Sequence, residues 1–231
     1  MDGLNIKCIT GIEQLMNMQA PIPDFASARL GMIESQLRPE GVADRAVLAA
    51  MGSIARESFV PTDSRALAYS DRAVALGNGR FLMAPAALGQ LLTEIAPTPG
   101  ERALVIGSGS GYAAAVLAAI GLEVTALESD PELAAAAREA GVETIEGPLD
   151  AGHRASAPFA LILIDGAVEA VPDAIIAQLA DGGRLGAALI DRSVTRLIVG
   201  RKSGEAFGFL SLGDAGVPPL PGFTRPRAFT F

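Results

Sequence analysis

The feature that most constrains the fold is a short apolar segment, residues 103–106, followed by a glycine-rich turn and an alanine-rich stretch. The segment reads Ala-Leu-Val-Ile, the turn reads Gly-Ser-Gly-Ser-Gly, and residues 112–120 favour a helix. An uncharged run of this length, bounded by a turn, is typical of a strand buried on both faces of a parallel sheet. A strand, a tight turn and a helix in this order predict an α/β fold.

The alternation of strands and helices continues along the chain. Further strands are expected at residues 123–127, 142–145, 159–164 and 184–190, with helices at residues 131–140 and 171–179. We therefore predict a doubly wound, mainly parallel sheet. Residues 194–200 and 206–212 flank a turn that contains Lys202, Ser203 and Gly204, and they predict an antiparallel hairpin at the end of the sheet. The proline-rich residues 217–231 are expected to be irregular.

The first hundred residues show mainly helical periodicity. Helices are expected at residues 25–38, 42–54 and 85–95, and an irregular loop at residues 61–83. Residues 1–24 have weak periodicity and are predicted to be a loosely attached extension. A length of 231 residues suits one compact structural domain. Within it we expect three parts: residues 1–24 (extension), 25–100 (helical) and 101–231 (α/β core).

Composition excludes several classes of protein. The net charge of −8 is unlike that of a nucleic-acid-binding protein, and one cysteine excludes an intrachain disulfide. With a single histidine as well, we expect no metal site. The longest uncharged apolar stretch, residues 111–122, is shorter than the roughly 20 residues that cross a bilayer. We predict a cytoplasmic protein with no membrane and no nucleic-acid partner.

The glycine turn and an acidic residue after it predict a nucleoside site. Glycines allow a tight turn and close approach of a ligand, and a helix N-terminus offers free N–H groups. Glu128 ends the next predicted strand, where a carboxylate can accept hydrogen bonds from both hydroxyls of a ribose. The dinucleotide pattern would place a third glycine at position 112, which is Tyr112 here. The alternative is a tight turn beside an incidental surface glutamate.

The chain resembles the protein-L-isoaspartate O-methyltransferase family over about residues 30–189. The resemblance is carried by residues 56–61 (Arg-Glu-Ser-Phe-Val-Pro), residues 68–72 (Ala-Tyr-Ser-Asp-Arg) and the glycine turn at residues 107–112. It implies a seven-stranded, Rossmann-like methyltransferase sheet with a helical N-terminal part that helps to cover the substrate. It also implies S-adenosylmethionine as the methyl donor and S-adenosylhomocysteine as the product.

The resemblance and the spacing together give the candidate site residues. Those expected to bind the cofactor are Gly107, Ser108, Gly109, Ser110, Gly111, Glu128, Ser129, Leu149 and Asp165. Those expected to bind the substrate are Arg80, Leu82 and Met83. Two of them have plainer interpretations, since Arg80 could be a solvated loop residue and Asp165 a turn residue before Gly166.

The sequence departs from the family at the site itself. The family's active loop carries a serine whose hydroxyl is thought to help catalysis or to position the acceptor carboxylate, and Met83 stands at that position. A thioether donates no hydrogen bond, so no catalytic residue is assigned. Val105 and Pro148 replace acidic residues that the family places on the donor side.

These features lead to two hypotheses. The first is an S-adenosylmethionine-dependent methyltransferase that acts on a carboxylate or another acceptor, in a protein, a peptide or a small molecule, with isoaspartate repair in doubt. The alternative is a catalytically degenerate protein that binds S-adenosylmethionine or a partner on the same fold.

Overall fold

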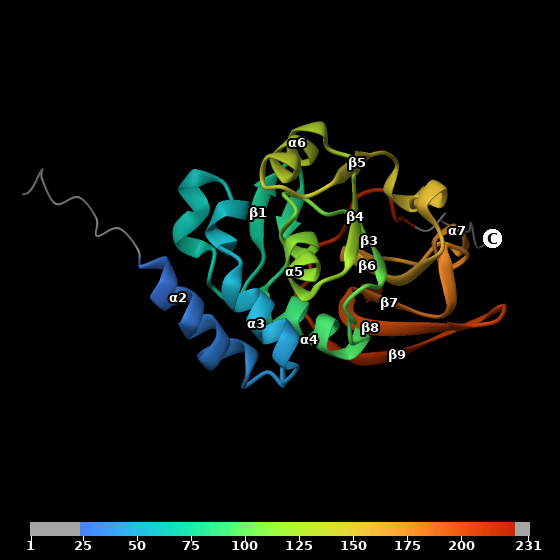
Figure 1. The fold of residues 1–231 in the computed structure, drawn as a ribbon, viewed down its shortest axis with the longest axis horizontal. Helices are drawn as coiled ribbons and strands as arrows, with labels where there is room; N and C mark the ends of the chain where they lie inside the picture. Colours follow the sequence, from blue (N-terminus) through green and yellow to red (C-terminus); the bar gives the residue numbers. More distant parts are fainter. Residues whose placement is uncertain (1–23, 225–231) are drawn as a thin grey trace, which may run out of the picture.

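A seven-stranded sheet forms the centre of the molecule (Figure 1). The computed structural model describes residues 24–224. The strand order is β5-β4-β3-β6-β7-β8-β9, in which the first five strands pair in parallel, β8 is antiparallel to β7, and β9 is antiparallel to β8. The strands are β3 (Arg102–Ile106), β4 (Glu123–Glu128), β5 (Thr144–Glu146), β6 (Phe159–Val168), β7 (Leu179–Asp191), β8 (Val194–Ser203) and β9 (Ala206–Asp214). The predicted sheet, with its antiparallel C-terminal hairpin, is confirmed.

Alternate residues of the central strands face two different hydrophobic clusters. Ala103 and Val105 of β3 pack with the N-terminal helices, whereas Leu104 and Ile106 pack in the second cluster on the other face. All four side chains are fully buried, as expected for a central strand of a parallel sheet. The helices are α2 (Phe25–Met32), α3 (Arg45–Ser53), α4 (Pro85–Ile95), α5 (Tyr112–Ile120), α6 (Pro131–Glu139) and α7 (Asp173–Ile176).

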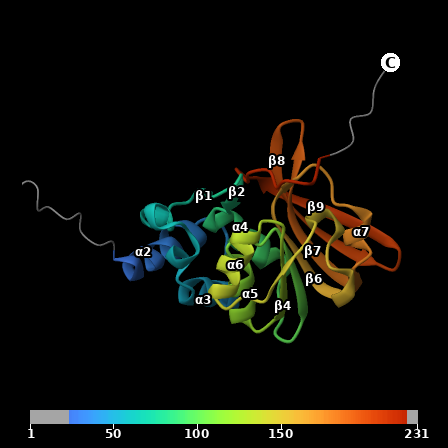
Figure 2. The ribbon, with the colours of Figure 1, turned by 90° about the horizontal axis from the view of Figure 1, so that it is seen from above.

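The helices are distributed unevenly over the sheet. Helices α3, α4 and α5 contribute buried residues to the first cluster, while the second cluster is covered by the single turn of α7 and by residues near the C-terminus, including Leu220 and Phe223. Helix α2 and helix α7 lie at opposite ends of the molecule in both ribbon views (Figure 2). No helix of residues 24–224 is both long enough and apolar enough to cross a membrane.

The predicted irregular loop at residues 61–83 is wrong. The structure has a 3-10 helix (Thr62–Leu67) and a hairpin of β1 (Val74–Gly77) and β2 (Arg80–Leu82) in this region. The hairpin turns at Asn78 and Gly79, both with positive φ. Asn-Gly is a strong hairpin signal because both residues tolerate the left-handed conformation. That signal was present in the sequence.

Several predicted boundaries also differ from the structure. Helix α2 ends at Met32 and continues as a π-helical turn (Ile33–Leu37). The helix expected at residues 171–179 shrinks to α7, because Pro172 precedes its first turn and Leu179 already pairs with Phe159 in the sheet. Strand β6 runs beyond residue 164, past an irregularity in its pairing with β7. The extension predicted for residues 1–24 lies almost wholly outside the described residues.

Candidate active site at the carboxyl ends of the strands

The glycine turn lies at the carboxyl end of β3 and leads directly into α5. Gly107, Gly109 and Gly111 all have positive φ, at 72°, 54° and 98°. The amide of Gly107 donates to the carbonyl of Leu127 on β4 at 2.8 Å, so the turn is attached to the neighbouring strand. Side chains larger than hydrogen are strained in this conformation, which explains the repeated glycine.

Glu128, the last residue of β4, is fully buried beside this turn. Its Oε2 accepts a hydrogen bond from the amide of Gly109 at 2.7 Å. Its Oε1 accepts hydrogen bonds from the amides of Ser129 and Asp130, at 2.7 and 3.0 Å. Three backbone donors hold the carboxylate at the position predicted to bind a ribose.

Arg80, from β2 of the hairpin, forms a buried ion pair with Glu128. Its Nη1 donates to Glu128 Oε1, and its Nη2 donates to the carbonyl oxygen of Gly107 at 2.8 Å. The side chain of Arg80 is only 4% exposed. The residue that was predicted to bind an acceptor therefore contacts the predicted cofactor-binding acid, over a separation of 48 positions in the sequence.

A C-terminal segment, residues 217–220, crosses the same edge of the sheet. The amide of Ala167 donates to the carbonyl of Pro218 at 2.9 Å, and the amide of Leu220 donates to the carbonyl of Ala167 at 2.7 Å. The Leu220 side chain packs directly on the glycine turn, since a Cβ atom added to Gly107 would lie 2.7 Å from its Cδ1. Residues 217–231 are predicted only to be irregular, so this contact is not anticipated, although Val217 and Leu220 are apolar residues in a proline-rich stretch.

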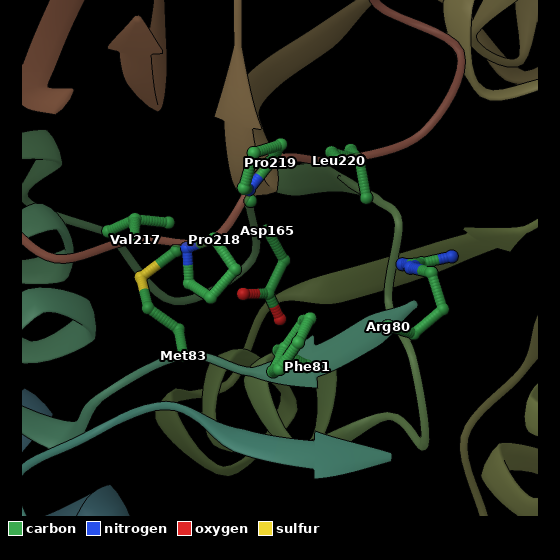
Figure 3. A pocket seen from close by; sticks show the side chains of 9 residues that line it. Arg80, Phe81, Met83, Asp165, Val217, Pro218, Pro219 and Leu220 are labelled. Carbon is green, nitrogen blue, oxygen red and sulfur yellow. The ribbon is translucent and has the colours of Figure 1, made fainter. Parts of the chain in front are cut away.

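Asp165, within β6, is buried in the space between the hairpin and this segment. Its Oδ1 has no hydrogen-bond partner. Burial raises the pKa of Asp165 to about 7, although the positive charges of Arg80 and Arg56 act in the opposite direction. The carboxyl group points into a cavity of about 10 Å³ that Arg80, Phe81 and Met83 also line (Figure 3). Such a cavity has room for about one water molecule.

Arg56 donates hydrogen bonds that hold the loop carrying Met83 in place. The fully buried guanidinium of Arg56 donates through Nε to the carbonyl of Ala68 and through Nη2 to the carbonyl of Met83, both at 2.6 Å. It also stacks on the ring of Tyr112, 4.7 Å from the centroid. Arg56 belongs to the stretch that carries the family resemblance, and its contacts link that stretch to the candidate active loop.

The other candidate residues differ in whether they lie beside the glycine turn or in the hydrophobic clusters. Ser108 is buried in the glycine turn and its hydroxyl has no partner, whereas the hydroxyl of Ser110 donates to the carbonyl of Phe59 at 2.5 Å. Leu82 and Leu149 belong to the hydrophobic clusters and do not line the cavity beside Asp165. No group of acidic, histidine or cysteine side chains in residues 24–224 is arranged to hold a metal ion.

The polar groups at this edge suit a nucleoside, but the available space does not. A buried carboxylate beside a glycine turn at the N-terminus of a helix is the arrangement that binds a ribose and the groups attached to it. In this conformation, however, Glu128 is paired with Arg80, and Leu220 covers the turn. Sites for ligands of drug size enclose roughly 300–1,000 Å³, far more than the cavity beside Asp165.

Comparison with known proteins identifies the family. The family model "Protein-L-isoaspartate(D-aspartate) O-methyltransferase (PCMT)" matches residues 30–206. Protein-L-isoaspartate O-methyltransferase of Methylorubrum populi is 43% identical over 165 residues, which cover 69% of this chain and 78% of that protein. Protein-L-isoaspartate O-methyltransferase 2 of Marinobacter nauticus is 38% identical over 210 residues, which cover 86% of this chain and 95% of that protein.

A solved structure shares the fold. It is described as a protein-L-isoaspartate O-methyltransferase from Plasmodium falciparum in complex with S-adenosyl-L-homocysteine. It superposes with a TM-score of 0.74 at 19% identity, covering 87% of this chain and all of that one. The fold therefore matches the expected Rossmann-like methyltransferase sheet. On the family model and the identity to these relatives, the chain belongs to the protein-L-isoaspartate (D-aspartate) O-methyltransferase family.

Proposed function

We propose that the chain is an S-adenosylmethionine-dependent methyltransferase whose acceptor is a carboxylate of a protein or peptide. The observation that carries the proposal is the contact between the glycine turn and the acid of the next strand, in which Gly109 donates to Glu128 at 2.7 Å. This pairing at the carboxyl ends of two adjacent parallel strands is where open α/β sheets bind ligands. Family membership supports the same cofactor and the same class of reaction.

The residues around the cavity suit a carboxylate acceptor. S-Adenosylmethionine supplies a methyl group on a positively charged sulfur, and a carboxylate is ionised at neutral pH and needs no general base. Positioning therefore provides much of the rate. When Arg80 is not paired with Glu128, its guanidinium can bind a carboxylate through two hydrogen bonds. Asp165, which lines the same cavity, can donate another hydrogen bond once it is protonated.

Isoaspartyl peptides are expected to be poor substrates. Met83 lines the cavity where the family serine is expected and is itself only 2% exposed. Loss of one hydrogen bond made in the transition state lowers a rate by about 10²–10³-fold. We therefore expect the natural protein to methylate an isoaspartyl peptide at a rate well below about 1 s⁻¹. Enzymes commonly reach about 1 s⁻¹ or more.

The substitution Met83→Ser tests this expectation. It is expected to raise the rate of methyl transfer to an isoaspartyl peptide by about tenfold or more, because it restores a hydroxyl donor. The matched control is Ala84→Ser, which adds the same hydroxyl one residue further along the loop. Transfer of a labelled methyl group gives the rate. A natural protein that already works at a common enzymatic rate would show that the serine is dispensable and that this part of the proposal is wrong.

The filled site favours a second candidate function. In this structure Arg80 and Leu220 occupy the position in which a nucleoside would contact Glu128 and Gly107. A catalytically degenerate protein that acts through a partner would have the same appearance. A binding experiment distinguishes the two functions. A methyltransferase binds S-adenosylhomocysteine at millimolar concentration, whereas a degenerate protein that has lost the ability to bind the cofactor does not.

A further inference from the structure

The proposed cofactor site is filled by groups that make the contacts a ligand would make. Arg80 donates to Glu128 and to the carbonyl of Gly107, so the acid and the glycine turn are both satisfied from within the chain. A buried carboxylate that lost its positive partner without replacement would be strongly destabilised. Arg80 therefore gives the buried carboxylate of Glu128 a positively charged partner from within the chain.

Residues 217–220 close the remaining space above the turn. Val217 and Leu220 are only 4% and 5% exposed, and two backbone hydrogen bonds join the segment to Ala167 at the end of β6. Leu220 also fills the space over Gly166, where an added Cβ atom would lie 2.9 Å from its own Cβ. The segment is therefore packed into the site.

Glycines flank the segment on both sides. It lies between Gly216 and Gly222, and Gly222 has a φ of 93° that few other residues adopt. Pro218 and Pro219 carry no amide donor, so this part of the segment makes fewer backbone hydrogen bonds than a strand would. Hinges are often built from small residues at the ends of elements.

We propose that Arg80 and residues 217–220 form an internal plug that occupies the S-adenosylmethionine site and moves out when the cofactor binds. This inference rests on the proposed function. The plug competes with the cofactor for the site. The apparent affinity for the cofactor is therefore the affinity of the open state multiplied by the fraction of molecules that are open. Substitutions that weaken the plug and remove no contact with the ligand are therefore expected to strengthen cofactor binding.

Titration calorimetry with S-adenosylhomocysteine tests the plug. Leu220→Ala is expected to bind at least about tenfold more tightly than the natural protein, because the truncated side chain packs less well over the turn. The matched control is Leu210→Ala, the same substitution at a leucine of β9 that is 76% exposed. Arg80→Ala is a second variant, which frees Glu128 without changing the segment. It is expected to bind more tightly as well.

Hydrogen exchange provides a readout that does not depend on affinity. The Leu220 amide, bonded to Ala167, is expected to be protected in the free protein and to lose protection in the presence of saturating S-adenosylhomocysteine. Equal affinities for the natural protein and both variants, with Leu220 still protected in the complex, would overturn the plug and leave the proposed function intact. If folded natural protein and folded variants all fail to bind, both the proposed function and the plug are wrong.

Discussion

Replacing Arg56 with alanine is expected to lower the free energy of unfolding by about 2–4 kcal/mol. The guanidinium is fully buried and donates to the carbonyls of Ala68 and Met83, which would both lose their partner. The substitution also leaves a cavity beside Tyr112. Burial of the Arg56 charge costs free energy and lowers the pKa of this group. Removing the charge therefore offsets part of the stability that is lost with the hydrogen bonds.

Urea unfolding of the natural protein and the variant measures this effect. Arg65→Ala is the matched control, since Arg65 is exposed on the 3-10 helix (Thr62–Leu67) and its loss is expected to change the unfolding free energy by no more than about 0.5 kcal/mol. An Arg56→Ala protein as stable as the control would show that Arg56 does not hold the loop of Met83 in place.

A second large effect is expected from the pH dependence of stability at Asp165. The pKa of this carboxyl is raised to about 7, chiefly by burial. An acid with a raised pKa in the folded state favours folding most at low pH, and this contribution is lost as the pH rises through the folded pKa. The free energy of unfolding is therefore expected to fall between about pH 4 and pH 7, by an amount on the order of 4 kcal/mol from this group alone.

Asp165→Asn removes that dependence, because an amide does not ionise. The variant is expected to be more stable than the natural protein at pH 8 and to lose this advantage towards pH 5. Denaturant unfolding at the two pH values measures the difference. Asp63→Asn is the control, as it removes an exposed carboxylate that does not line the cavity. Parallel pH profiles for the natural protein and Asp165→Asn would contradict the assignment of the titration to this carboxyl.

The elements that form locally were predictable from the sequence. The strand at residues 103–106, the glycine turn and Glu128 follow one another within a short stretch, and their order fixes where they lie in a parallel sheet. Hydrophobic runs therefore predicted the sheet and its antiparallel end. The strands of the hairpin at Asn78 and Gly79 are only a few residues long and show little periodicity, so the Asn-Gly turn is the one local signal for it.

The contacts that fill the site depend on the tertiary structure. Arg80 and Glu128 meet across 48 positions of sequence, and residues 217–220 return to the glycine turn from the far end of the chain. Neither contact follows from periodicity or from local spacing. Arg80 was expected to bind an acceptor because an arginine in an active loop suits a carboxylate. The structure provides a carboxylate for it within the chain.

Titration with S-adenosylhomocysteine, carried out on the natural protein and on Glu128→Gln, tests the central claim most directly. The natural protein is expected to bind, and Glu128→Gln is expected to bind about 10- to 150-fold more weakly, because a charge-assisted hydrogen bond is worth roughly 1.5–3 kcal/mol. Glu123→Gln, at the exposed start of the same strand, is expected to bind like the natural protein. The claim is contradicted if the folded natural protein does not bind at millimolar concentration, or if it binds a nicotinamide dinucleotide more tightly.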